Sequence, residues 1–133
     1  MASQVVTAAG DLSVVEFQSY VRGYHAYMQS WSPVVGQALN LKREPSNAYD
    51  VHAVVVYYEN QVVGHVPYNL APTVSAFLRR DINKGFAGVT GAKINRGAGY
   101  NLEVPCTYRL YSPKVYVDRM KDIIENWHSA GYV

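Results

Sequence analysis

The sequence lacks several features on which secreted, membrane and disulfide-stabilised proteins depend. It contains one cysteine, Cys106, so no disulfide can form within the chain, which agrees with a reducing compartment. No stretch approaches the roughly 18 apolar residues that a membrane-spanning helix needs. Residues 1–10 contain no basic residue and only a weak apolar run, so they do not resemble a signal peptide. We therefore expect an intracellular protein that does not enter a membrane.

The residue patterns of common catalytic and metal sites are also missing. There is no P-loop, no Cys-x-x-Cys pair and no serine-centred nucleophile elbow. The histidines are scattered without His-x-His or HExxH spacing, which argues against a metal site; they are His25, His52, His65 and His128. Cys106 follows a proline in an apolar segment and is better explained as a buried structural thiol than as a nucleophile. The sequence predicts a non-enzymatic protein with no cofactor and no metal.

Charge is scarce overall but unevenly distributed. The formal net charge is only +2. Residues 1–60 carry three basic and five acidic side chains, a balance of −2, whereas residues 61–110 carry six basic and two acidic ones, a balance of +4. A basic middle could attract phosphate groups. It could equally be a solvated surface, because this charge is far less dense than that of a dedicated nucleic-acid-binding protein.

Hydrophobic periodicity predicts one mainly β (α+β) domain. The length of 133 residues fits a single domain, which we place at residues 13–133, after a flexible tail over residues 1–12. Alternating or β-branched apolar residues predict six strands, at 14–27, 37–42, 53–58, 62–66, 86–95 and 102–111. Short strands with one inserted helix are typical of a small, partly open barrel.

Two segments show helical spacing instead. The first follows the fourth strand, with Asn69 as the expected cap, Pro72 in the first turn and Gly85 at the end. Its apolar stripe comprises Leu70, Val74, Phe77, Leu78 and Ile82. The second is a C-terminal amphipathic helix over residues 113–130, with Ser112 as the expected cap at its start and Gly131 after its end. Its apolar stripe must be buried, either against its own domain or by self-association.

Two short motifs carry the functional signal. The segment Arg43-Glu-Pro-Ser-Asn-Ala-Tyr-Asp50 is a polar turn that ends in an aromatic residue and a carboxylate, directly before the apolar run Ala53-Val-Val-Val56. The next strand ends in Gly64-His-Val-Pro67. This order brings Tyr49, Asp50 and His65 together without any nucleophile beside them. We interpret the cluster as a recognition site.

These motifs resemble the HIRAN domain family over roughly residues 18–112. The lead-in Val21-Arg-Gly-Tyr-His-Ala-Tyr27 and the exit Leu102-Glu-Val-Pro-Cys106 are similar too. The resemblance implies an OB-like barrel, a six-stranded and partly open one with one inserted helix and a C-terminal helix. Family members in SWI/SNF-type DNA remodelling enzymes grip the 3′-hydroxyl end of single-stranded DNA, whereas the ligands of stand-alone members are uncertain. The resemblance also implies a role in DNA repair and a location in the nucleus.

A grip on a DNA end needs a stacking surface, an acceptor for the hydroxyl group and a contact to phosphate. Tyr24, Tyr27 and Tyr49 are candidates for stacking, which contributes about 1–3 kcal/mol per base. The resemblance implies that Asp50 accepts the hydrogen bond of the 3′-hydroxyl and that His65 contacts a phosphate. The same carboxylate would repel a 3′-phosphate. Each residue also has a structural alternative, because Asp50 and Asn47 could organise the turn, and Tyr49 and His65 could serve packing.

The sequence departs from the DNA-gripping pattern at several places. His25 stands at an arginine position, Ala26 at an aromatic one, and Tyr68 at that of a lysine. Leu102 stands where the last strand has an aromatic residue, and His52 where an asparagine is usual. The candidate nucleic-acid-binding residues are therefore Tyr24, His25, Tyr27, Asn47, Tyr49, Asp50, His65, Tyr68 and Leu102. We expect a monomer that binds single-stranded DNA ends more weakly than the best members, or alternatively a protein-interaction module that keeps the barrel without the DNA grip.

Overall fold

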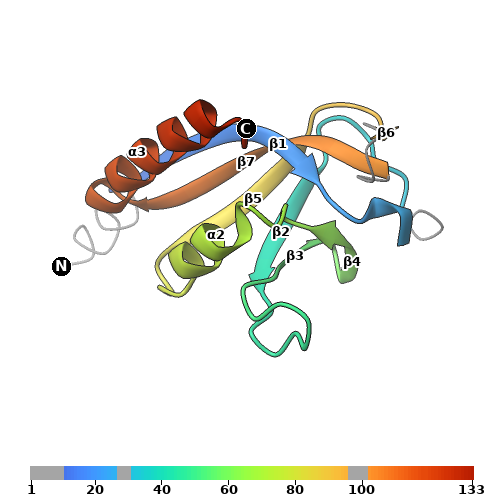
Figure 1. The fold of residues 1–133 in the computed structure, drawn as a ribbon, viewed down its shortest axis with the longest axis horizontal. Helices are drawn as coiled ribbons and strands as arrows, with labels where there is room; N and C mark the ends of the chain where they lie inside the picture. Colours follow the sequence, from blue (N-terminus) through green and yellow to red (C-terminus); the bar gives the residue numbers. More distant parts are fainter. Residues whose placement is uncertain (1–10, 27–30, 96–101) are drawn as a thin grey trace.

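A single antiparallel sheet dominates the computed structural model, which describes residues 11–26, 31–95 and 102–133, with the side chains of His25 and Asn95 left out (Figure 1). The strand order is β1-β7-β5-β2-β3-β4, and each neighbouring pair is antiparallel. The strands are β1 (Leu12–Val21), β2 (Ala38–Arg43), β3 (Val54–Tyr58), β4 (Gln61–His65), β5 (Lys84–Val89) and β7 (Leu102–Pro113). A two-residue strand, β6 (Ile94–Asn95), pairs with β7 off this path. The expected six-stranded, mainly β fold is confirmed.

The core lies on the side of the sheet that the helices cover. In β1, Val15, Phe17 and Val21 are buried, whereas Val14 and Glu16 on the other face are exposed. Phe17 stacks on Tyr108 of β7 at 5.3 Å between ring centroids and meets Trp127 edge to face at 5.2 Å. Trp127 belongs to the C-terminal helix, so helix and sheet share one core.

The two ends of the sheet meet at one point, which makes the sheet a partly open barrel. Directly after β1, the backbone of Arg22 exchanges two hydrogen bonds with that of His65 at the end of β4, each 2.8 Å long. Gly64 permits this approach, because a Cβ atom there would overlap the side chain of Val21 and lie only 2.5 Å from the carbonyl oxygen of Arg22. The bridge therefore places the lead-in motif beside the Gly-His-Val-Pro motif.

Two helices complete the domain, α2 (Ala71–Leu78) and α3 (Lys114–Ala130). In Figure 1, α3 runs along β1 and β7, and its buried residues Val117, Met120, Ile124 and Trp127 join the core. Packing on its own domain thus accounts for the apolar stripe. Gly131 follows α3 as predicted.

The helix starts differ from the predicted ones. Leu70, not Asn69, is the residue before the first turn of α2, and neither helix has a side-chain cap. Ser112 instead donates a hydrogen bond to the buried Asn83, which in turn binds the carbonyl oxygen of Phe77 at the end of α2. The polar side chain expected to cap α3 therefore ties β7 to the segment after α2.

Three predicted boundaries were also wrong. The strand predicted to reach Tyr27 ends at Val21, because Gly23 has a positive φ of 80° and the chain turns into a short 3₁₀ helix, η1 (Tyr24–Ala26). Helix α2 ends at Leu78 rather than near Gly85, which leaves Ile82 49% exposed. The strand predicted over residues 86–95 is divided into β5 and β6. Of the predicted tail, residues 1–10 lie outside the described residues.

Candidate nucleic-acid interface

The turn between β2 and β3 is organised by its own side chains. The Oδ1 atom of Asn47 accepts hydrogen bonds from the backbone N–H groups of Tyr49 and Asp50, at 2.8 and 3.0 Å. Its Nδ2 atom donates to Oε1 of Glu44 at 2.8 Å. At the base of the turn, the backbone N–H of Glu44 donates to the carbonyl oxygen of Ala53. Asn47 therefore organises the turn, and its role as a ligand-binding residue stays a prediction.

Asp50 and Tyr49 stand at the open end of this turn. Oδ1 of Asp50 accepts a hydrogen bond from the backbone N–H of His52 at 2.9 Å, and no other partner of this carboxylate occurs among the described residues. Asp50 is half-buried, so it is fixed by the turn yet reachable from solvent. Tyr49 is 100% exposed and is not packed in the core. The turn therefore carries a held carboxylate and, one residue earlier, a free aromatic ring.

His65 lies beside the turn and is tied to it by a carboxylate. Its Nε2 atom is 3.3 Å from Oε1 of Glu44, the same oxygen that binds Asn47. The hydrogen bond from Asn47, followed by the contacts with His65, holds the pKa of Glu44 below its ordinary value against the opposing effect of burial. Glu44 is thus a site-organising residue that the sequence analysis did not single out, although it belongs to the motif that begins at Arg43.

A stacked cation and aromatic ring lie next to His65, because the backbone of Arg22 pairs with that of His65. The guanidinium carbon of Arg22 is 3.6 Å from the ring centroid of Tyr68, which remains 66% exposed. Nε of Arg22 also donates to the carbonyl oxygen of Val66 at 3.3 Å. Sequence analysis missed Arg22 as a site residue, since only the backbone bridge to His65 brings it here.

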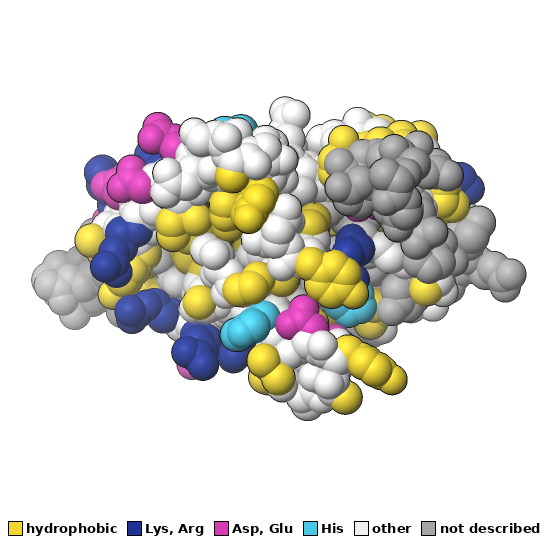
Figure 2. All heavy atoms as spheres, viewed as in Figure 1, with side chains coloured by type: hydrophobic (Ala, Val, Ile, Leu, Met, Phe, Trp, Pro, Cys, Tyr) yellow, Lys and Arg dark blue, Asp and Glu magenta, His cyan; other side chains and the backbone are white. Residues whose placement is uncertain are grey.

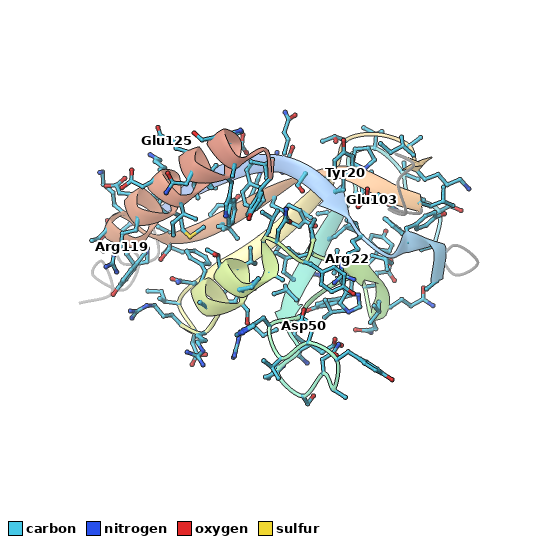
Figure 3. All side chains as sticks on the ribbon, in the orientation of Figure 1. Tyr20, Arg22, Asp50, Glu103, Arg119 and Glu125 are labelled. Atoms are coloured by element: carbon cyan, nitrogen blue, oxygen red, sulfur yellow. The ribbon has the colours of Figure 1, made fainter. Side chains whose placement is uncertain are left out.

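Arg22 and Tyr68 also border a groove, whose lining does not include Tyr49, Asp50 or His65. Its volume is about 570 Å³, and its lining includes Tyr20, Arg22, Tyr68, Thr90 and Glu103. In Figure 3, Arg22 is seen between Asp50 on one side and Tyr20 with Glu103 on the other. Figure 2 shows acidic, histidine and hydrophobic side chains together on the same face, with a basic side chain beside them. The face therefore combines hydrogen-bond acceptors, cations and stacking surface.

The structure distributes the remaining predicted site residues differently. Tyr24 is only 2% exposed, and its hydroxyl donates to the carbonyl oxygen of Trp31 at 3.1 Å, so it supports the fold and offers no free face here. Leu102 is half-buried and packs against the core. Tyr27 and the side chain of His25 lie outside the described residues.

The described part of the chain offers little support for catalysis or metal binding. Cys106 is buried, as predicted, and burial raises the pKa of its thiol to about 12, so it is not a nucleophile. No group of three His, Cys, Asp or Glu side chains among the described residues could hold a metal ion. Within the same ranges, no helix has the length and apolar character needed to cross a membrane.

Comparisons with known proteins agree on one family. The family model of the HIRAN domain matches residues 14–108. No curated protein sequence matches the chain. The crystal structure of the HIRAN domain of human HLTF is similar with a TM-score of 0.69 and 19% identity, covering 88% of this chain and 93% of that one.

Two further solved structures share the fold. The NMR structure of the HLTF HIRAN domain in its DNA-bound conformation has a TM-score of 0.61 and 18% identity, covering 94% of this chain and 96% of that one. A crystal structure of a protein from Lactobacillus plantarum has a TM-score of 0.53 and 20% identity, covering 76% and 99%. HIRAN domains are non-catalytic modules, which confirms the prediction that the chain is not an enzyme. With more than half of its length matched by the family model, the chain belongs to the HIRAN domain family.

Proposed function

We propose that the protein is a DNA-binding module that recognises the free 3′-hydroxyl end of single-stranded DNA. The observation that carries this proposal is the pairing of a half-buried Asp50 carboxylate, held by the turn, with the fully exposed ring of Tyr49. Family membership supports it, as does the fold shared with a HIRAN domain solved in a DNA-bound conformation. A protein with such a role would act in the nucleus, in DNA repair.

The chemistry of a strand end fits this pair. A 3′-hydroxyl donates a hydrogen bond, and the Asp50 carboxylate can accept it with its remaining lone pairs. The terminal base can stack on Tyr49, which contributes about 1–3 kcal/mol. A 3′-phosphate would bring negative charge against Asp50 and would be repelled. One carboxylate thus favours a hydroxyl end and excludes a phosphorylated one.

A matched pair of oligonucleotides tests the proposal. Fluorescein-labelled ten-nucleotide thymidine strands, identical except for a 3′-hydroxyl or a 3′-phosphate, are titrated with the protein at two salt concentrations. We expect at least tenfold tighter binding of the hydroxyl form, because losing a hydrogen bond to a charged group costs about 1.5–3 kcal/mol. Asp50→Asn should remove most of the preference. Equal binding of both strands by the unchanged protein would refute the proposal.

A second candidate function, a protein-interaction module, is favoured by a different part of the surface. A groove of about 350 Å³ lies between α2 and α3, and its lining includes Phe77, Met120 and Ile123 together with Arg80 and Arg119. Figure 2 shows lysine and arginine side chains gathered toward the same side of the molecule. Under this alternative, DNA affinity would be weak and insensitive to salt, because real phosphate contacts make affinity fall steeply as salt rises.

A further inference from the structure

Arg22 is a partly buried cation without an ion-pair partner among the described residues. Its backbone N–H and carbonyl groups are both bonded to His65, and its Nε donates to Val66. Arg22 forms no ion pair with a carboxylate of the described residues, and neither terminal guanidinium nitrogen has a hydrogen-bond partner among them. The side chain is therefore held in place at its stem while its charged end stays available, which is the state of an anion-binding group before its ligand arrives.

Tyr68 supplies the second half of the arrangement. The guanidinium group covers its ring from one side at 3.6 Å, and 66% of the residue is still exposed. A guanidinium stacked on a ring keeps its N–H donors in the plane of the group, where they point past the ring edge. The uncovered part of the Tyr68 ring remains free for a base, which can stack on any aromatic face regardless of sequence.

We propose that Arg22 and Tyr68 form a second nucleotide subsite, in which Arg22 binds a phosphate of the DNA strand and Tyr68 stacks on a base next to the terminal nucleotide. This inference rests on the proposed function, because the backbone bridge sets Arg22 beside His65, one of the residues proposed to hold the strand end. The resemblance in sequence puts Tyr68 at a lysine position. Arg22, from the opposite edge of the barrel, supplies a positive charge at that position.

The groove beside the pair has room for such a nucleotide. Its volume of about 570 Å³ lies within the range of about 300–1,000 Å³ that is usual for ligand sites. Glu103 also lines this groove, but it is only 2% exposed and engaged in an interaction within the protein, so Arg22 dominates the accessible charge. Phosphate rather than a cation is therefore the group that fits.

A double-mutant cycle tests the phosphate contact: the charge of Arg22 and the charge of one DNA phosphate are removed separately and then together. The DNA is the ten-nucleotide strand with a 3′-hydroxyl, in which a neutral methylphosphonate replaces either of the two linkages nearest the 3′ end. We expect one of these to weaken binding to the unchanged protein about tenfold, and Arg22→Gln to weaken binding of the natural strand by a similar factor. Combining Arg22→Gln with the neutral linkage should reduce the affinity no further, because both changes remove the same contact.

Matched variants separate this contact from general electrostatics and from misfolding. Arg79→Gln removes an exposed charge at the end of α2 and should keep the full sensitivity to the neutral linkage. Tyr68→Phe should bind like the unchanged protein, whereas Tyr68→Leu should weaken binding at least fivefold and become insensitive to an abasic nucleotide at the subsite. Thermal melting of each variant shows whether the fold is kept.

The outcomes distinguish the subsite from end recognition. The protein could prefer the 3′-hydroxyl strand while the affinity losses from Arg22→Gln and from the neutral linkages add up. That result would overturn the subsite alone. Equal binding of the 3′-hydroxyl and 3′-phosphate strands would overturn end recognition and the subsite that depends on it. If the affinity losses are non-additive and Arg22→Gln still prefers the 3′-hydroxyl strand, the subsite and end recognition are both established.

Discussion

Replacing Gly64 by alanine should open the barrel at the point where the binding face is assembled. A Cβ at this position would lie 2.5 Å from the carbonyl oxygen of Arg22, and real Cβ contacts essentially never fall below 3.0 Å. Relief requires the end of β4 to move away from Arg22 by about half an ångström, which weakens the two 2.8 Å backbone hydrogen bonds between Arg22 and His65. Overpacking costs about 1–3 kcal/mol, and each hydrogen bond contributes about 1 kcal/mol.

Together these effects should lower the free energy of unfolding by about 3 kcal/mol. A thermal melt followed by circular dichroism measures this loss. With an unfolding entropy of about 2.1 cal/mol/K per residue, the 133 residues give a fall in Tm of about 10 °C. Gly91→Ala is the matched control, since its Cβ would meet only Pro105 at 3.4 Å, an ordinary contact. A Tm for Gly64→Ala within about 2 °C of the unchanged protein would refute the reasoning that this glycine closes the barrel.

Three further predictions follow from other residues. Cys106, buried with its pKa raised to about 12, should not react with a thiol reagent at pH 8 until the protein is denatured, and rapid labelling of the native protein would contradict this. The lowered pKa of Glu44 means that its contribution to stability is present above pH 4.5 and lost as the pH falls through its pKa in the folded protein, so the Tm difference between Glu44→Gln and the unchanged protein should shrink between pH 5.5 and 3. A constant difference across that range would contradict the assignment. Trp127→Ala should cost about 4 kcal/mol in a denaturant titration, because the indole packs on Phe17 in the shared core, and a loss below about 1 kcal/mol would show that α3 is not part of the fold.

Local patterns predicted the strands and the turn well. The alternation of Val15, Phe17 and Val21 fixed the buried face of β1, and the polar run from Glu44 to Asp50 became the turn that Asn47 organises. Such features depend on periodicity and on hydrogen bonds between near neighbours, which a sequence displays directly.

Contacts between distant segments could not be predicted in the same way. Arg22 joins the site only because Gly64, 42 positions later, allows β1 and β4 to meet, and no periodic signal marks that encounter. Tyr24 resembled a stacking residue but is buried against Trp31, a partner seven positions later in the sequence. The predicted caps at Asn69 and Ser112 also differed from the structure, since Ser112 found a tertiary partner in Asn83.

The proposed function requires that the protein binds a strand end rather than the length of a strand. Competition between a linear 40-nucleotide strand with a 3′-hydroxyl and the same strand closed into a circle separates the two, because the strands carry the same bases and nearly the same charge. We expect that only the linear strand displaces a labelled 3′-hydroxyl oligonucleotide from the protein. Equal displacement by the circle would contradict it.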